Sequence, residues 1–365
     1  MITFDGVTKQ YPDGTVAVDD LTLEVAEGTL AVFVGPSGCG KTTSMRMINR
    51  MIDPTSGTLT VKGDDVTKVD PVKLRLGIGY VIQSAGLMPH QRVVDNVATV
   101  PVLKGESRRA ARKAALGMLE RVGLDPKLAN RYPAQLSGGQ QQRVGVARAL
   151  AADPPILLMD EPFSAVDPVV REELQTEILR LQSELHKTIV FVTHDIDEAI
   201  KIGDKVAVFG RGGVLQQYDE PPRLLSNPAN DFVAGFIGAD RGYRGLQFRH
   251  ATGLPVHEIR TVTEPEINEL SLGPSDWVLV NKSDGTPYAW INAGGVTLHC
   301  DGKSLYDSTI AGGSLFRPND SLRQALDAAL SSPSGLGVAV DGDGRPIGGV
   351  LADDVLTALK KQRDG

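Results

Sequence analysis

The stretch Thr29–Arg50 reads TLAVFVGPSGCGKTTSMRMINR, and its three parts decide the fold expected for the N-terminal region. The short apolar run Leu30–Val34 predicts a buried strand, and the good helix formers after the glycine-rich loop predict a helix. Between them, GPSGCGKT at residues 35–42 fits the pattern G-x-x-x-x-G-K-[ST] in the strand–loop–helix context that this pattern requires. The stretch therefore predicts a phosphate-binding loop, against the alternative of a glycine-rich turn with an incidental lysine.

The chemistry of this loop lies in its backbone and in two side chains. Glycines let consecutive N–H groups point at phosphate oxygens, and the positive end of the helix adds to the attraction. Lys41 supplies a mobile cation for the β- and γ-phosphates, and the hydroxyl of Thr42 suits Mg²⁺. The nucleotide-binding residues expected here are Gly35, Pro36, Ser37, Gly38, Cys39, Gly40, Lys41, Thr42 and Thr43.

Further apolar runs alternate with helical patterns along the chain. Apolar runs lie at Ile78–Ile82, Pro155–Met159, Ile189–Val192 and Val206–Phe209, and helical patterns at Ser107–Val122, Gly138–Leu150, Pro168–Leu185 and Asp195–Ile202. This alternation predicts an α/β fold with a mainly parallel sheet covered on both faces.

Two carboxylates end one of the expected strands, in the sequence ILLMDEP at residues 156–162. In a parallel sheet this strand end lies beside the phosphate loop. We expect Asp160 to hold Mg²⁺, usually through water, and Glu161 to polarise the attacking water. Taken alone, an apolar strand ending in Asp-Glu is equally well explained as a pair of solvated carboxylates.

Composition narrows the class of protein. The 365 residues are 41% hydrophobic, carry a net charge of −7 and include 2 cysteines. A collagen-like or wholly disordered chain is excluded, no basic excess favours nucleic-acid binding, and a disulfide framework is not expected. No apolar run approaches the ~18 residues that span a bilayer, and the N-terminus has no signal-peptide pattern. We therefore expect a cytoplasmic protein whose membrane role, if any, comes through a partner.

A resemblance to a known family appears at a further motif, between the phosphate loop and the Asp-Glu strand. This motif resembles the signature loop of ATP-binding cassette (ABC) ATPases and consists of Leu136, Ser137, Gly138, Gly139 and Gln140. Independently of the family, Ser and two glycines at a helix start present N–H groups and a positive helix end, which is a second anion site. The resemblance implies the P-loop NTPase fold of an ABC-type nucleotide-binding domain that binds ATP with Mg²⁺.

The remaining positions of the family pattern are matched one by one. Gln83 stands where the Q-loop glutamine reaches the metal and the attacking water, and His194 stands at the switch-histidine position. Residues 164–167 (SAVD) resemble the D-loop and end in Asp167, with Val166 where Leu is usual. Tyr11 resembles the aromatic that stacks on adenine, although an aromatic before a turn often only packs.

One phosphate loop and one signature per chain imply a dimer. In this family the signature of one copy covers the ATP held by the phosphate loop of the other. The resemblance thus implies two composite sites between identical subunits, with ATP favouring the closed pair through phosphate contacts that ADP lacks.

One branch of the family matches residues 2–238 almost continuously. YPDGTVAVDDL, MINRMIDPTSG, IGYVIQSAGLMPH and THDIDEAIKIGD resemble the ATPase subunits of glycine betaine/proline/choline (osmoprotectant) importers. The resemblance implies an ATPase coupled to uptake of a quaternary amine, bound to membrane permease subunits at the cytoplasmic face of the membrane. A solute-binding protein would act indirectly, and no nucleic acid is expected. The permease is expected to contact the segment Ser84–His90.

The C-terminal part carries a weak internal repeat. Val278–Ile291 and Val338–Val350 each predict a hairpin with an Asp-Gly turn, and Ser321–Leu330 has helical apolar spacing. We expect an ABC domain at 1–238, a Gly/Arg-rich linker at 239–248, and a regulatory α+β domain at 249–365. The resemblance implies tandem cystathionine-β-synthase-type (CBS) modules, the first degenerate before Trp277 and the second at about 315–361.

Three alternatives remain open at this point. The ATPase could serve the import of another small solute, or act outside transport in translation or DNA repair. The C-terminal modules could form an inert spacer or dimer brace rather than a sensor.

Overall fold

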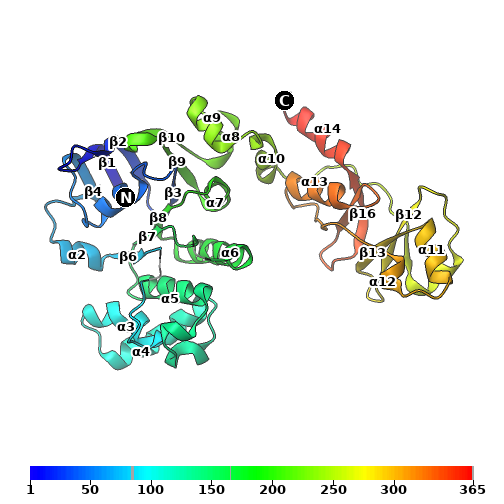
Figure 1. Ribbon diagram of the computed structural model, residues 1–365, viewed down its shortest axis with the longest axis horizontal. Helices are drawn as coiled ribbons and strands as arrows, with labels where there is room; N and C mark the ends of the chain where they lie inside the picture. Colours follow the sequence, from blue (N-terminus) through cyan, green and yellow to red (C-terminus); the bar gives the residue numbers. More distant parts are fainter. Residues whose placement is uncertain (84–85, 165, 364–365) are drawn as a thin grey trace. The chain divides into compact units, whose positions relative to one another are not determined.

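The computed structural model describes residues 1–83, 86–164 and 166–363, and the chain folds as two units, Met1–Ala239 and Asp240–Gly365 (Figure 1). In the part of the chain that is described, no helix is both long and apolar enough to span a bilayer.

The first unit is organised around a six-stranded sheet with the strand order β10-β9-β3-β8-β7-β6. All its neighbouring pairs are parallel except β10 with β9, so the mainly parallel sheet predicted from the sequence is confirmed. Its strands are β3 (Leu30–Val34), β6 (Ile78–Val81), β7 (Ile156–Asp160), β8 (Thr188–Val192), β9 (Lys205–Phe209) and β10 (Leu215–Asp219).

This sheet separates two hydrophobic cores. Side chains alternate along β3, so that Leu30, Val32 and Val34 join one core while Ala31 and Phe33 join the other. Helices cover the first face, and these are α3 (Val93–Leu103), α4 (Arg108–Arg121), α5 (Gly138–Leu150), α6 (Pro168–Leu185), α7 (Ile196–Ile202), α8 (Pro221–Ser226) and α9 (Asp231–Ile237). The four helices predicted from the sequence are confirmed as α4, α5, α6 and α7.

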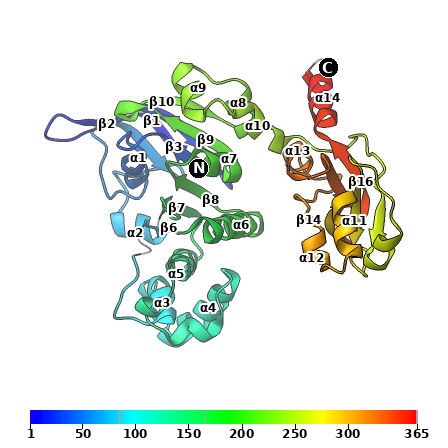
Figure 2. The ribbon, with the colours of Figure 1, turned by 45° about the vertical axis from the view of Figure 1, so that its right-hand side comes forward.

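The second face is covered by α1 (Lys41–Ile48) and by a four-stranded sheet that the sequence patterns did not predict. That sheet has the order β2-β1-β4-β5, and its pairs are antiparallel. Its strands are β1 (Ile2–Gln10), β2 (Val16–Val25), β4 (Ser56–Val61) and β5 (Asp64–Asp65). The turn from β1 to β2 therefore lies on the same side of the molecule as α1 (Figure 2).

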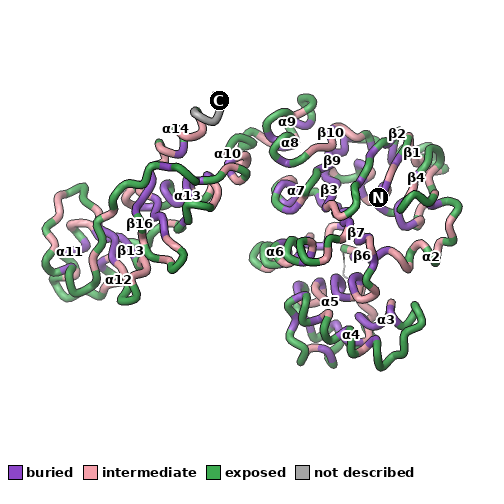
Figure 3. Tube along the Cα trace, turned by 180° about the vertical axis from the view of Figure 1, so that it is seen from behind, coloured by how far each residue is buried: buried purple, intermediate pink, exposed green. Residues whose placement is uncertain are grey.

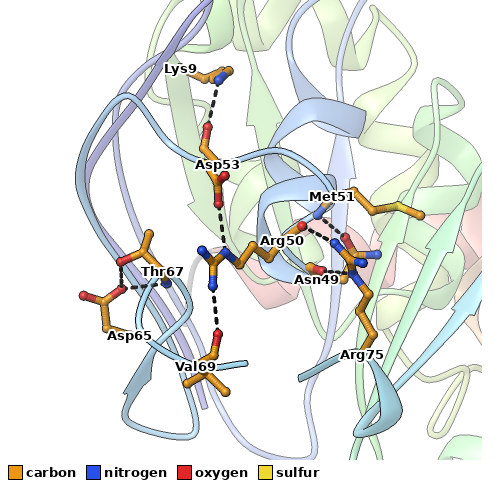
Figure 4. A network of polar contacts seen from close by, with 9 residues as sticks. All are labelled: Lys9, Asn49, Arg50, Met51, Asp53, Asp65, Thr67, Val69 and Arg75. Carbon is orange, nitrogen blue, oxygen red and sulfur yellow. Dashed lines mark hydrogen bonds and ion pairs between the residues drawn. The ribbon is translucent and has the colours of Figure 1, made fainter. Parts of the chain in front are cut away.

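A polar network fixes the carboxyl end of α1. Arg50 Nε donates to Asp53 Oδ1 at 3.0 Å and its terminal nitrogen donates to the Val69 carbonyl at 2.7 Å (Figure 4). Arg75, on α2 (Pro71–Leu76), donates to the Asn49 carbonyl at 3.1 Å. Arg75 also donates to the Arg50 carbonyl at 2.6 Å, so its guanidinium satisfies two carbonyls directly after α1 and helps to hold the phosphate-loop helix in place.

Short 3₁₀ segments connect the remaining parts of the first unit. They are η1 (Pro126–Asn130), η2 (Pro133–Gln135) and η3 (Arg211–Gly213).

The second unit repeats one arrangement twice. In the first copy β11 (Thr261–Thr263) runs parallel to β12 (Trp277–Asn281), which pairs antiparallel with β13 (Pro287–Asn292) before α11 (Ala293–Cys300). In the second copy Phe316 forms a parallel bridge to β15 (Leu336–Val340), which pairs antiparallel with β16 (Pro346–Leu351) before α14 (Ala352–Arg363). Both predicted hairpins are confirmed as β12–β13 and β15–β16.

The copies differ ahead of their hairpins. The first carries the 3₁₀ segment η5 (Glu264–Glu269), whereas the second carries α13 (Leu322–Ser331), which confirms the predicted helix. Buried side chains of the two hairpins pack together, Leu279 and Trp290 against Val338 and Val340 (Figure 3 marks buried segments). The first copy also contains α12 (Leu305–Ser308) and β14 (Ile310–Ala311).

The structure corrects the expectation that residues 239–248 form a linker. Most of this stretch is helical, in α10 (Arg241–Gly245) and η4 (Leu246–Phe248). Leu246 is buried in a core of the second unit, and the ring of Tyr243 lies 4.8 Å below the Arg323 guanidinium of α13. These contacts make the stretch an integral part of the second unit.

Candidate functional site

The loop between β3 and α1 has a backbone that only glycine allows. Gly40 has φ 91°, and a Cβ there would lie 2.1 Å from the Ala17 carbonyl oxygen on β2. Gly35 has φ 154°, and a Cβ there would lie 2.3 Å from the Phe209 carbonyl oxygen on β9. Gly40 is also the N-cap of α1 and supplies no capping side chain, so the first N–H groups of α1 are left for a ligand.

Lys41 lies inside this loop. Its side chain is buried, and Nζ donates to the carbonyls of Gly35 at 2.7 Å and Pro36 at 2.9 Å. Ser37 and Gly38 at the tip are exposed. Cys39 is buried in the core beneath the loop, so only its main chain is placed to meet a ligand.

Asp160, at the end of β7, faces the start of α1. Thr42 Oγ1 donates to Asp160 Oδ1 at 2.9 Å, while Thr43 beside it is half-buried. Burial is the main cause that raises the pKa of Asp160, and the Thr42 hydrogen bond and the Arg46 charge oppose it. A buried carboxylate next to a hydroxyl is a pair of oxygen ligands that suits Mg²⁺.

Two residues near Asp160 were missed in the sequence analysis. Arg46 lies 3.8 Å from Asp160 Oδ2, and the Tyr80 hydroxyl donates to the same oxygen at 3.5 Å. Arg46 stands four residues after Thr42 on α1, and this spacing places both on one helix face. Tyr80 belongs to β6, next to β7, so only the strand order reveals it.

Glu161 and His194 meet across neighbouring strand ends. His194 Nδ1 lies 3.3 Å from Glu161 Oε2, and the Glu161 N–H donates to the Val192 carbonyl at 3.0 Å. Glu161 has φ 43°, a left-handed conformation that is strained for a non-glycine residue. The structure thus brings together two residues that are 33 positions apart in the sequence.

Gln83 follows β6 and is exposed. Val81, two residues before Gln83, pairs with Met159, the residue that precedes Asp160. Ser84 and Ala85, which open the segment expected to contact a permease, lie outside the described residues.

The residues 136–140 form the start of α5. Ser137 Oγ accepts the Gln140 N–H at 3.3 Å and Gln140 Oε1 accepts the Ser137 N–H at 3.1 Å, a reciprocal cap. The helix therefore begins at Gly138, and the Ser137 N–H, which was expected to be free, donates to the Gln140 side chain instead. Leu136 and Gly139 are buried, and a Cβ on Gly139 would lie 2.5 Å from a methyl of Val170.

The signature residues are separate from the site built so far. Ser137 and Gly138 are exposed. Among the described residues, the hydrogen bonds of residues 136–140 go to their own helix and to the Pro133 carbonyl, not to the phosphate loop. A single chain therefore presents an exposed, glycine-bordered helix start apart from its own phosphate loop.

Tyr11 and Asp167 were also expected in the site. Tyr11 lies in the turn from β1 to β2, where its N–H donates to the Thr15 carbonyl at 2.9 Å and Lys9 Nζ lies 5.5 Å from its ring. This turn leads to Ala17, the residue that Gly40 touches. Asp167 caps α6, since its Oδ1 accepts the Val170 N–H at 3.1 Å. Ala165, in the middle of the expected D-loop, lies outside the described residues.

The comparisons with known proteins agree with this geometry. Residues 18–164 match the family model "ABC transporter". The osmoprotectant import ATP-binding protein OsmV of Salmonella typhimurium is 40% identical and is matched over 100% of this chain and 97% of its own length. The carnitine transport ATP-binding protein OpuCA of Listeria monocytogenes is 52% identical over 66% of this chain, which spans 60% of the length of that relative.

A solved structure matches the first unit. The ATP-binding cassette MJ0796, as a dimer in a post-hydrolysis state bound to ADP and Pi, is 34% identical with a TM-score of 0.56, over 60% of this chain and 99% of that chain. The phosphate loop, the paired carboxylates and the full-length match to OsmV lead to one conclusion. The chain belongs to the ATP-binding proteins of the ABC transporter family.

Proposed function

We propose that this chain is the ATP-hydrolysing subunit of an ABC importer for a compatible solute. The observation that carries the proposal is the meeting of three loops at neighbouring strand ends of β3, β8 and β7. Thr42 bonds to Asp160 at 2.9 Å, and Glu161 lies 3.3 Å from His194. Hydroxyl, carboxylates and imidazole thus converge at the edge where phosphates bind.

Each residue has a distinct part in the proposed reaction. The phosphate loop and Lys41 bind the phosphates, and Tyr11 stacks on the adenine. Glu161 accepts a proton from the attacking water, while His194 and Gln83 orient the γ-phosphate and that water. Because the nucleophile is water, the protein acts by alignment and charge stabilisation rather than by covalent chemistry.

Mg²⁺ fits the oxygen atoms present at this site. Thr42 Oγ1 and Asp160 Oδ1 offer a hydroxyl and a buried carboxylate, and Mg²⁺ prefers such ligands together with phosphate oxygens and water. Among the described residues, no cluster of three or more His, Cys, Asp or Glu side chains could hold a metal by itself. The ion would neutralise charge on the phosphates, and it would be held at Thr42, Asp160 and Gln83.

The exposed helix start at Ser137 supports a dimer. In one chain it lies free of the phosphate loop, and the related cassette MJ0796 was solved as a dimer. We infer that two copies place Ser137, Gly138 and Gly139 over the nucleotide of the partner, with Asp167 close to the shared interface. Two such sites would open and close with ATP, and this movement would drive a membrane permease at the cytoplasmic face of the membrane.

The solute is inferred from the relatives. OsmV is named for osmoprotectant import and OpuCA for carnitine transport, and OsmV matches both units of this chain. We infer import of a quaternary amine such as glycine betaine, delivered to the permease by a solute-binding protein. The repeated strand–hairpin–helix arrangement of the second unit supports tandem CBS-like modules that regulate transport.

The test is ATP hydrolysis by the purified chain and by Glu161→Gln. The variant keeps the shape of the side chain but not its basicity, so hydrolysis should fall by roughly 10²–10⁴-fold while ATP binding persists. Glu220→Gln, at an exposed glutamate of the first unit, is the matched control and should keep the normal rate. Normal turnover in Glu161→Gln would refute the role of Glu161.

The identity of the imported solute is tested by measuring its uptake into cells. Cells carrying the chain with its permease should take up labelled glycine betaine, and unlabelled choline or carnitine should compete. Loss of uptake in Glu161→Gln, with uptake kept in Glu220→Gln, would link transport to hydrolysis. Failure of every quaternary amine to be taken up would assign the importer to another small solute.

A further inference from the structure

A second group of polar side chains lies beside Glu161 and His194, on α6 and at the start of α7. Arg171, Asp195 and Glu198 line the same small hollow as Glu161 and His194. The roles described above use neither Arg171 nor its partners. Their contacts form a continuous bridge between the segments that follow β7 and β8.

Arg171 makes the first connection of this bridge, close to the start of α6. One terminal nitrogen donates to the Val166 carbonyl at 3.2 Å, in the segment that leads from Glu161 to α6. The other terminal nitrogen lies 4.0 Å from Asp195 Oδ2. Asp195 follows His194 directly, so a single guanidinium spans from the Glu161 segment to the His194 segment.

The residues on either side of His194 are themselves held in place. Asp195 Oδ1 accepts the Asp197 N–H at 2.8 Å and thereby caps α7, and the Asp195 N–H donates to Thr193 Oγ1 at 3.0 Å. The Thr193 N–H donates to the Phe33 carbonyl of β3 at 3.1 Å. A displacement of Asp195 would therefore also displace the backbone of His194, its neighbour in the chain.

Gln175 and Glu198 make the second connection of the bridge. Gln175 lies one helical turn after Arg171 on α6, and Glu198 lies on α7. Gln175 Nε2 donates to Glu198 Oε1 at 3.0 Å, and both side chains are buried. Burial is the main cause that raises the pKa of Glu198, and the hydrogen bonds from Thr193 and Gln175 oppose it. This pair joins α6 to α7 below the turn that bears His194.

The contacts of Arg171 contribute little to the stability of the fold. Its Nε is buried and, among the described residues, has no hydrogen-bond partner, and its ion pair is long at 4.0 Å. A buried unsatisfied donor costs free energy, and a half-exposed ion pair returns little. An ion pair this weak does not account for the arginine, which is better explained by the two segments that its guanidinium connects.

We propose that Arg171 is a positioning residue that couples the backbone at Val166 to the turn carrying His194. The inference rests on the proposed ATP hydrolysis and adds a residue to it. When the Val166 segment moves, as it would on pairing with a second copy, Arg171 carries the movement to Asp195. His194 then reaches its place beside Glu161 only when the segment before α6 is in position.

The experiment measures kcat and KM for ATP in the full chain carrying Arg171→Gln, Asp195→Asn or both. Asp195→Asn keeps the oxygen that caps α7 and removes only the charge facing Arg171. Glu172→Gln is the matched control, because Glu172 neighbours Arg171 on α6 but pairs with Lys201 at the surface at 3.1 Å. Thermal unfolding of each variant reports on stability in parallel.

The bridge predicts a specific pattern of rates. Arg171→Gln should lower kcat about tenfold or more while KM for ATP stays within about twofold, because alignment is lost and binding is not. The double variant should be no slower than Arg171→Gln, since both substitutions break one connection. A purely structural role would instead lower the melting temperature and leave kcat near that of Glu172→Gln.

Two results would overturn the inference. One is a kcat for Arg171→Gln equal to that of Glu172→Gln, and the other is multiplication of the two single effects in the double variant. Should Arg171→Gln fail to fold, Arg171→Lys repeats the test, because it keeps the charge but cannot reach both partners. Absence of ATP hydrolysis in the unmodified chain would refute the proposed function itself, and the role of Arg171 with it.

Discussion

Thr42 and Asp160 are 118 residues apart, yet a hydrogen bond of 2.9 Å joins the first turn of α1 to the end of β7. The contact places a hydroxyl and a buried carboxylate side by side where the phosphate loop opens. Burial raises the pKa of this carboxyl group, so the ionised form that Mg²⁺ requires is held at a cost in stability. Such a cost is typical of functional groups, and it leads to a measurable effect of pH.

Asp160→Asn should stabilise the nucleotide-free protein while abolishing Mg²⁺-dependent hydrolysis. Because the folded pKa lies above the unfolded value, the ionised group destabilises the fold at pH values above that folded pKa. The cost falls as the pH drops through the folded pKa, and it disappears well below the unfolded value of about 3.9, where Asp is protonated in both states. The melting temperature of the variant should therefore exceed that of the unmodified chain at pH 7, and the difference should shrink as the pH falls toward about 3.

The control for this prediction is Asp19→Asn, which changes an exposed aspartate of the first unit. Its melting temperature should follow the unmodified chain at every pH. A lower melting temperature of Asp160→Asn at pH 7 would show that the carboxylate is not under the strain that its burial indicates.

Comparing two serine residues that cap helices distinguishes an effect on stability from an effect on ATP hydrolysis. Ser137 Oγ and Ser107 Oγ each accept a backbone N–H at 3.3 Å, at the starts of α5 and α4. Replacing either by alanine should cost about 1 kcal/mol of folding stability, because each removes one helix cap. Only Ser137→Ala should also slow ATP hydrolysis, since Ser137 is proposed to face the nucleotide of the partner. Equal rates in the two variants, measured by phosphate release, would remove Ser137 from the site.

Local patterns predicted much of the first unit. The prediction of a strand, a tight loop and a helix from residue 30 onward is confirmed. A buried strand, a glycine-rich loop and a helix start each have a distinct local sequence pattern. The Ser321–Leu330 helix and both Asp-Gly hairpins were equally local. These features depend on neighbours in sequence, so a single chain suffices to predict them.

Features that depend on distant contacts were not predictable. The sheet formed by β1, β2 and β4 pairs Ile2 with both Val25 and Val61, and no local pattern specifies those partners. Tyr80 joins Asp160 only because β6 lies beside β7. The stretch 239–248 looked like a linker from its glycines and arginines, whereas burial of Leu246 in the second unit makes it structural.

Removal of residues 240–365 tests whether the second unit regulates. The first unit has two hydrophobic cores of its own, so we expect it to fold and to hydrolyse ATP. If the repeated modules act as a sensor, the response of transport to ionic strength should disappear in the shortened chain while uptake itself persists. An unchanged response, with the shortened chain present at the same level in the membrane, would assign the modules to a spacer or brace.

Two copies of the chain are proposed to share each nucleotide, and sedimentation of Glu161→Gln tests this sharing directly. With MgATP the monomer–dimer equilibrium should shift toward the dimer relative to MgADP, because the γ-phosphate adds contacts to Ser137 of the partner. Adding Ser137→Arg to Glu161→Gln should abolish that shift while ATP still binds at the phosphate loop. Identical distributions in ATP and ADP, with nucleotide bound in both, would contradict the shared site.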